Sequence, residues 1–221
     1  MSSSEAHAVS GGRGEPHLAH HFDTQHQQDS AVRLGMWLFL GTEVLLFAGL
    51  FLGYTVYRNF YHEAFHEASR HLNLMLGTTN TIVLITSSLS VALGFHAIKT
   101  GNEKLCAAML VFTILCAMAF LGIKSVEYAD KFREGALPGK WYHFEEITAP
   151  GANLYYTVYF LATGLHAFHV LVGMCVLAWV LKGVVKGKYG PRNYVAVELG
   201  GLYWHLVDLV WIFLFPLLYL I

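Results

Sequence analysis

The chain has 221 residues, of which 55% are hydrophobic and 13% are charged, and its formal net charge is -1 at pH 7. So apolar a composition excludes an ordinary soluble domain, and the lack of a basic stripe argues against a nucleic-acid partner. The three cysteines, Cys106, Cys116 and Cys175, lie in apolar segments without a Cys-x-x-Cys spacing, so we expect neither a disulfide framework nor a structural zinc site.

Residues 1–30 are rich in Ser, Gly, Gln and His and carry almost no large apolar residues. Such a composition predicts a disordered polar tail, which we place on the cytoplasmic side. Its histidines, His17, His20, His21 and His26, are of a type that binds divalent ions. Nothing in the sequence fixes their geometry, so we favour a solvated tail with incidental histidines.

Five apolar segments follow, at residues 33–58, 74–99, 105–126, 153–182 and 195–221. Each is long enough to cross a hydrocarbon core of ~30 Å as a helix, and helices satisfy their own backbone hydrogen bonds in lipid. Residues 31–221 are therefore predicted to form one all-α domain, a polytopic bundle of five transmembrane helices. The basic loop 182–192 carries no acidic residue and predicts an inside N-terminus and an outside C-terminus.

Small residues spaced four apart predict two places where helices approach closely. These are Ser90 with Gly94 in the second span and Gly49 with Gly53 in the first.

Glu43 lies in the middle of the first apolar segment. A carboxyl group at that depth costs roughly 2.5–3.5 kcal/mol on insertion scales, so it indicates a specific role. Further polar residues occur in or at the ends of the spans: Glu127, His166, His169, Glu198, His205 and Asp208. By helical spacing His166 and His169 share one face, and Glu198, His205 and Asp208 share another. We expect these side chains to point into the bundle and to pair with one another.

Three interpretations of these residues remain open from the residues alone. They could join helices by hydrogen bonds worth ~0.6 kcal/mol each. They could ligate a haem through a pair of histidines, although His-x-x-His on one helix does not place ligands on opposite sides of an iron. They could form a proton relay through Glu43. The sequence does not separate the first interpretation from the third.

Motifs spread over the whole membrane part resemble subunit III of the haem-copper respiratory oxidases, the cytochrome c oxidase subunit III family. They are Gly35-Met-Trp-Leu-Phe-Leu-Gly-Thr-Glu43, Leu76-Gly-Thr-Thr-Asn80, Val126-Glu127-Tyr128, Phe160-Leu-Ala-Thr-Gly-Leu-His166-Ala-Phe-His169-Val-Leu-Val-Gly173 and Glu198-Leu-Gly-Gly-Leu-Tyr-Trp204-His205-Leu-Val-Asp208-Leu-Val-Trp211. Mitochondrial-type members have seven helices. This chain resembles the shorter five-helix bacterial form, because a polar tail stands where the first two helices would lie.

The resemblance implies a non-catalytic, multi-pass subunit in the bacterial cytoplasmic (inner) membrane. It implies no catalytic residue and no metal, haem or copper in this chain, because the redox centres belong to subunits I and II. The complex would reduce oxygen to water with electrons from cytochrome c and pump protons. Subunit III would bind phospholipid and support proton uptake and the stability of subunit I.

The resemblance also implies roles for particular residues. Glu43 matches the family's carboxyl group that reacts with hydrophobic carbodiimides. Glu127, His166, His169, Glu198, His205 and Asp208 would form a buried polar network that joins the last two helices and shapes the lipid cleft. Lys182 and Arg192 would contact lipid phosphate, although an ordinary positive-inside loop explains the same two residues.

Several alternatives follow from this comparison. The five-helix form also occurs in quinol oxidases and as an accessory subunit of nitric oxide reductases, so quinol is a second candidate electron donor. A small subunit or extra helices of a partner could replace the two missing helices. A free-standing carrier is disfavoured by the lack of an internal repeat. A haem-binding membrane anchor would show a haem absorption band in the isolated chain.

Overall fold

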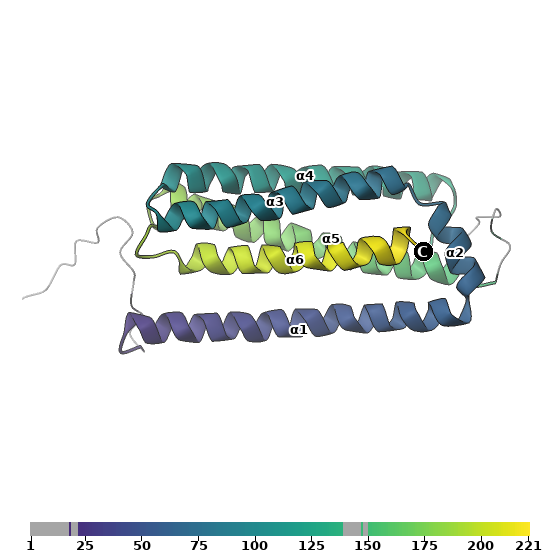
Figure 1. Ribbon diagram of the computed structural model, residues 1–221, viewed down its shortest axis with the longest axis horizontal. Helices are drawn as coiled ribbons and strands as arrows, with labels where there is room; N and C mark the ends of the chain where they lie inside the picture. Colours follow the sequence, from purple (N-terminus) through teal and green to yellow (C-terminus); the bar gives the residue numbers. More distant parts are fainter. Residues whose placement is uncertain (1–17, 19–21, 139–146, 148–149) are drawn as a thin grey trace, which may run out of the picture.

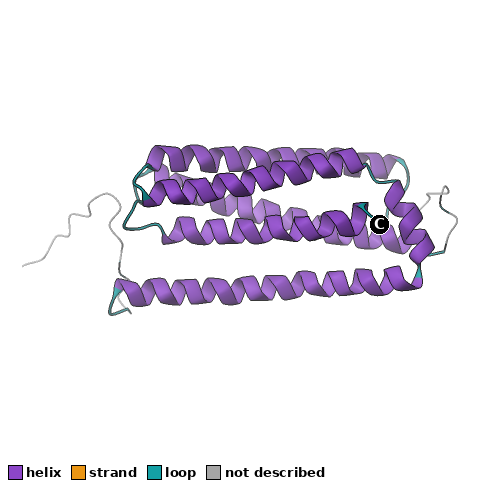
Figure 2. Ribbon diagram, viewed as in Figure 1, coloured by secondary structure: helices purple, strands orange, loops and turns teal. Residues whose placement is uncertain are grey.

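The computed structural model describes residue 18, residues 22–138, residue 147 and residues 150–221. These residues form six helices and contain no strand (Figures 1 and 2). The helices are α1 (Gln25–Phe60), α2 (His62–Arg70), α3 (Leu74–Lys99), α4 (Glu103–Arg133), α5 (Ala152–Val185) and α6 (Val195–Tyr219). All except α2 are long and apolar enough to cross a membrane. The prediction of an all-α bundle with five spans is therefore confirmed, whereas its orientation in the membrane stays a prediction.

The first helix begins earlier than predicted. Thr24 caps α1 with its side-chain oxygen, which accepts a hydrogen bond from the Gln27 amide at 3.2 Å. Residues 25–30, which we had assigned to the polar tail, are consequently helical and include His26. The predicted tail extends too far along the chain because the first turns of α1 are polar. They lack the apolar residues by which a membrane span is recognised in a sequence. His17, His20 and His21 lie outside the described residues.

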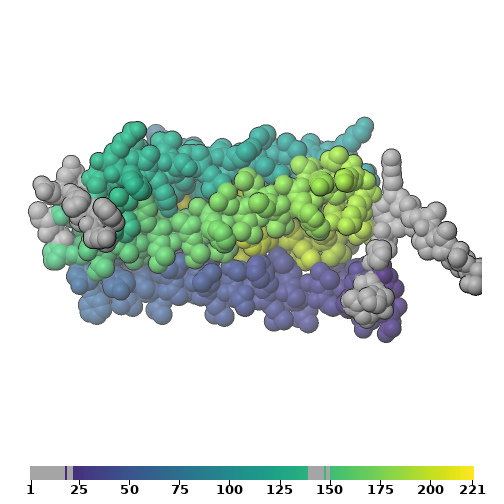
Figure 3. Space-filling model, turned by 180° about the vertical axis from the view of Figure 1, so that it is seen from behind, coloured from purple at the N-terminus to yellow at the C-terminus, as the bar shows by residue number. Residues whose placement is uncertain are grey.

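Helices α3, α4, α5 and α6 pack as a four-helix core, in which α3 lies against α4 and α6, and α5 lies against the same two helices. Helix α1 lies along the outside of α5 and α6 (Figure 1), and the space-filling view from behind shows it as a band along one edge of the molecule (Figure 3). The start of α1 and the C-terminus lie at opposite ends of the bundle. We call these ends the N-terminal end and the C-terminal end.

Asparagine side chains start both α3 and α4, and a glycine sets the turn between them. Asn73 and Asn102 cap α3 and α4 with their side-chain oxygens, which accept from Leu76 N at 3.2 Å and from Leu105 N at 3.1 Å. Gly101 adopts a φ of 83°, which a residue with a side chain rarely adopts, so it ends α3 sharply. The short connection places α3 and α4 side by side as antiparallel neighbours.

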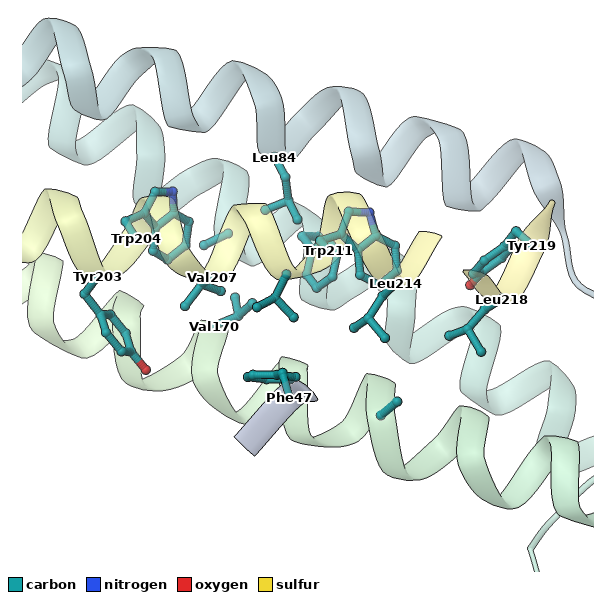
Figure 4. Packing of buried hydrophobic residues seen from close by; sticks show 14 of the residues in the cluster. Phe47, Leu84, Val170, Tyr203, Trp204, Val207, Trp211, Leu214, Leu218 and Tyr219 are labelled. Carbon is teal, nitrogen blue, oxygen red and sulfur yellow. The ribbon is translucent and has the colours of Figure 1, made fainter. Parts of the chain in front are cut away.

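The core is built around two tryptophans of α6, Trp204 and Trp211, both fully buried (Figure 4). Phe120 of α4 contacts Trp211 edge to face, with ring centroids 4.9 Å apart. Leu84 of α3 and Val170 of α5 fill the space beside them. The apolar centre of the bundle is thus formed jointly by the four core helices.

One of the two predicted close approaches is confirmed. Ser90 Oγ donates to the Met109 carbonyl at 2.9 Å, and a Cβ placed on Gly94 would lie 3.2 Å from Met109 Cβ. The prediction for Gly49 and Gly53 is wrong within the described chain, since a Cβ on either would meet no atom within 4 Å. This part of α1 turns its small residues away from the bundle, so they allow no approach between the helices of this chain.

Helix α2 was not predicted. It is a short amphipathic helix whose buried residues, Ala64, Phe65, Ala68 and Ser69, recur at helical spacing, whereas His62 and His66 are exposed. Phe65 packs against the rings of Tyr54 on α1 and Tyr155 on α5. Helix α2 thereby closes the C-terminal end of the bundle between α1 and the core.

Candidate functional site

Glu43 on α1 and His169 on α5 form a pair midway along their helices. Glu43 Oε2 lies 2.8 Å from His169 Nε2, and the two side chains are 16% and 10% exposed. The other ring nitrogen, Nδ1, lies 2.8 Å from the Leu165 carbonyl, which can only accept, so Nδ1 carries a proton. A single further proton is then shared between Glu43 and Nε2, either on a neutral carboxyl group that donates or on an imidazolium that faces a carboxylate.

Two more polar contacts hold α1, one towards each end. At the N-terminal end Arg33 donates from Nη2 to Glu198 Oε2 of α6 at 2.9 Å and from Nε at 3.3 Å. At the C-terminal end the Tyr54 hydroxyl donates to the Leu217 carbonyl. Helix α1 is therefore attached at three depths, although little of its apolar surface is buried.

The last turn of α6 has carbonyl groups without a helical donor, and hydroxyl groups of α1 and α5 satisfy two of them. Tyr54 of α1 donates to Leu217, and Tyr155 of α5 donates to Leu218 at 2.7 Å. Just beyond the helix, the carbonyl of Ile221 lies 2.9 Å from Ser69 Oγ of α2, which is equally close to the His66 carbonyl of its own helix. These contacts fix the end of α6 against helices that are distant in sequence.

The three polar residues of α6 do not pair with one another, contrary to our expectation. Glu198 bonds Arg33 of α1, and His205 Nδ1 lies 2.7 Å from Ser88 Oγ of α3. Both oxygens of the buried Asp208 carboxyl group lack a hydrogen-bond partner in the described part of the chain. Glu198 and His205 are ~10 Å apart along the helix, too far to meet, so each bonds a neighbouring helix instead.

His166 and His169 also separate. His166 is fully buried in the core, where its ring lies 5.3 Å from that of Trp211 and 5.5 Å from that of Phe120. Neither of its ring nitrogens has a hydrogen-bond partner among the described residues. His169 instead faces α1 through Glu43. Of the expected network between α5 and α6, these residues therefore show two contacts. The His166 ring packs on Trp211, and the Tyr203 hydroxyl donates a long hydrogen bond of 3.4 Å to the His169 carbonyl.

Glu127 belongs to a second polar cluster, at the C-terminal end of the core. Lys124 Nζ lies 3.1 Å from Glu127 Oε2, and both side chains are almost completely buried. The hydroxyl groups of Tyr159 and Tyr219 donate to Glu127 Oε1, the former at 2.8 Å, and they also lie within 3.1 Å of Lys124 Nζ. The cluster joins α4, α5 and α6. Sequence reasoning missed Lys124; its spacing of three residues before Glu127 was the available signal.

Two cavities lie side by side at the N-terminal end of the bundle. One, of about 520 Å³, is an open cavity lined by residues of α1, α5 and α6, among them the apolar Met36, Phe39 and Val176, and by Lys188. The other, of about 210 Å³, is lined by Lys182, Lys186, Lys188, Trp179 and Tyr189. Trp179 and Lys188 line both cavities.

The electrostatics of the smaller cavity favour an anion. It gathers three lysines, and Lys188 Nζ lies 5.9 Å from the Trp179 ring and 5.6 Å from the Tyr189 ring. Burial raises the pKa of the Tyr189 phenol, so this ring adds no negative charge to the cavity. Of the two predicted phosphate contacts, Lys182 lines the cavity, whereas Arg192 is exposed and lines neither cavity.

No set of three His, Cys, Asp or Glu side chains in the described ranges is arranged to hold a metal ion. The family model for cytochrome c oxidase subunit III matches residues 17–221. The chain belongs to the cytochrome c oxidase subunit III family.

Relatives in this family come from several lineages. The cytochrome c oxidase subunit 3 of Corynebacterium diphtheriae is 32% identical over 192 residues, which cover 86% of this chain and 88% of that protein. The protein of the same name from Thermostichus vulcanus is 29% identical over 200 residues, which cover 90% of this chain and 92% of that protein. The haem-copper oxidase subunit I+III of Aeropyrum pernix is 28% identical over 86% of this chain and 23% of that larger protein.

Proposed function

We propose that this chain is the non-catalytic third subunit of a proton-pumping haem-copper oxidase that reduces oxygen to water with electrons from cytochrome c. Membership of the family supports the complex, and the relatives named cytochrome c oxidase subunit 3 support the electron donor. In this proposal subunits I and II hold the haems and copper, and this chain holds none. The relative that carries subunits I and III in one chain supports subunit I as the direct partner.

The role of the chain within the complex is to hold phospholipid against subunit I, and so to sustain proton uptake and the stability of subunit I. The observation that carries this proposal is the pair of adjoining cavities at the N-terminal end. The larger, at about 520 Å³ and with apolar walls, is of a size typical of small-molecule sites and suits part of an acyl chain. The smaller presents Lys182, Lys186 and Lys188 to a phosphate group.

The same lysines support the proposed orientation in a bacterial cytoplasmic membrane. Short loops rich in Lys and Arg lie on the cytoplasmic side of multi-pass proteins. Lys182 lies in the last turn of α5, and Lys186 and Lys188 lie in the connection to α6, at the end of the bundle where α1 begins. The N-terminal end would then face the cytoplasm and the cavities would lie in the inner leaflet.

The outer side of α1 remains for a small subunit, or for extra helices of a partner, in place of the two helices that longer family members have. Large apolar residues on this side are exposed, among them Leu45 at 72% and Leu52 at 67%. Lipid alone would satisfy these apolar side chains. We propose a partner on this side of α1 because the longer form of the family has two further helices.

The proposed function is tested on the complex purified through this chain in a mild detergent. We expect subunits I and II to copurify and oxygen uptake to be driven by reduced cytochrome c; uptake driven only by quinol would reassign the donor. Native mass spectrometry should detect bound anionic phospholipid. Val176→Trp, which fills the larger cavity, should remove that lipid, whereas Leu161→Trp on the exposed side of α5 should retain it. Equal lipid content in both variants would refute the lipid site.

A further inference from the structure

A polar pair lies halfway through the membrane on a surface that no helix of the described chain covers. His205 lies ten residues after the start of α6 and fourteen before its end, and Ser88 lies near the middle of α3. His205 Nδ1 and Ser88 Oγ are 2.7 Å apart, and both side chains are only partly buried. The pair joins α3 and α6 where these two helices pack against each other.

The second ring nitrogen of His205 is the informative atom. In the described part of the chain Nε2 has no hydrogen-bond partner, and it is not among the buried side-chain atoms that lack one, so it reaches the surface. Hydrocarbon offers nothing to bond it, and an imidazole at this depth is too short to reach water at either interface. A polar group from outside the described part of the chain is therefore required at this point.

Apolar side chains flank the pair on both helices. By helical spacing Ile85 and Ala92 share the outward face of Ser88 on α3, and Leu209 and Ile212 share that of His205 on α6. Ile85, Leu209 and Ile212 are each about half exposed, at 52%, 51% and 47%. We call these six residues the Ser88–His205 face.

We propose that a transmembrane helix of oxidase subunit I packs on the Ser88–His205 face and supplies a hydrogen-bonding group to His205 Nε2 at mid-depth. The inference rests on the proposed function, which makes subunit I the neighbour in the membrane. A relative that contains subunits I and III in one chain favours subunit I over a second copy of this chain. The face is distinguished from the exposed side of α4, where Val111, Phe112, Leu115 and Met118 present only apolar side chains.

The direct test is photo-cross-linking at Leu209 in the intact complex. A benzophenone amino acid is placed at Leu209, and membranes are illuminated before detergent is added. The matched control carries the same group at Leu115 of α4, which is exposed to a similar degree, 54% against 51%. We expect an adduct with subunit I from Leu209, several-fold above that from Leu115. His205 remains intact in this variant.

A second measurement addresses the hydrogen bond itself. His205→Phe should weaken retention of subunit I about threefold to tenfold, the range expected for one polar contact between helices. His205→Gln keeps a hydrogen-bonding group and should restore most of the retention, whereas Leu115→Phe should change nothing.

The outcomes separate the inference from the proposed function. If subunit I copurifies but Leu209 yields adducts only with lipid or with a second copy of this chain, the docking face is refuted and the proposed function stands. Equal adduct yields with subunit I from Leu209 and Leu115 would also refute the face. If the unsubstituted chain does not copurify with subunit I, the proposed function fails and the inference fails with it.

Discussion

His169 of α5 holds Glu43 of α1 at 2.8 Å in the middle of the membrane, and the Leu165 carbonyl determines the protonation of the pair. Because that carbonyl fixes a proton on Nδ1, one remaining proton is shared by Nε2 and the carboxyl group. The pair is neutral overall in either arrangement of that proton, which explains how a glutamate and a histidine can lie at this depth without an external counter-ion.

The first prediction concerns the reactivity of Glu43. A hydrophobic carbodiimide requires a protonated carboxyl group in apolar surroundings, and the neutral arrangement of the pair supplies one. We expect Glu43→Gln to abolish labelling and to leave assembly intact, because the glutamine amide can still donate to His169 Nε2. The measurement is mass spectrometry of labelled peptides. Glu198→Gln, which alters a carboxylate paired with Arg33, is the control and should retain full labelling. Labelling that persists in Glu43→Gln would contradict the assignment.

The second prediction concerns the buried ion pair of Lys124 and Glu127. Lys124→Met should lower the free energy of unfolding by ~3–5 kcal/mol, because the Glu127 carboxylate would remain buried without its cation. The double variant Lys124→Met/Glu127→Gln should recover part of that loss, since no charge is then left unpaired. Denaturant unfolding in detergent measures both effects. Lys104→Met, at an exposed lysine of the same helix, is the control, and equal stability of the two single variants would rule out a structural role for the pair.

The third prediction concerns the attachment of α1 at the C-terminal end. Tyr54→Phe removes the hydroxyl that donates to the Leu217 carbonyl and should lower the free energy of unfolding by ~1–3 kcal/mol, since a carbonyl of α6 is then left without a donor. Tyr57→Phe, at an exposed tyrosine one turn later, should have no measurable effect. Unfolding midpoints of the two variants give the comparison, and identical midpoints would show that the hydroxyl does not anchor α1.

The spans were predictable from the sequence because their signal is local. Each apolar segment of sufficient length became a helix, and the second one has the same bounds in the sequence and in the structure, residues 74–99. Helix α2 was not predicted because it has few buried residues, which alternate with polar and charged ones. These buried residues are Ala64, Phe65, Ala68 and Ser69. A search at the helical period, rather than for long apolar runs, would have detected it.

The partners of the polar residues were not predictable in the same way. Helical spacing identifies the face on which Glu198 or His205 lies, but it does not give the rotation of one helix against the next. Arg33 and Glu198 are 165 residues apart, and Ser88 and His205 are 117 apart. Such contacts depend on how the helices pack, so the sequence predicted that these residues would be bonded and misassigned their partners. Asp208 was expected to pair with its neighbours on α6, but both of its carboxyl oxygens lack a hydrogen-bond partner among the described residues.

The last prediction separates the glycines by the space around them. A Cβ on Gly173 would lie 2.9 Å from Trp204 Cε3 and 3.2 Å from Tyr203 Cε1, so α5 and α6 would have to move apart. We expect Gly173→Ala to lower the free energy of unfolding by ~1–3 kcal/mol through this overpacking. Gly49→Ala on α1 meets no atom within 4 Å and should be neutral or stabilise the helix by up to ~1 kcal/mol. Both variants keep the helical backbone, so the difference between their unfolding midpoints reports the contact alone. A Gly173→Ala variant as stable as Gly49→Ala would mean that α5 and α6 do not pack this closely around Trp204.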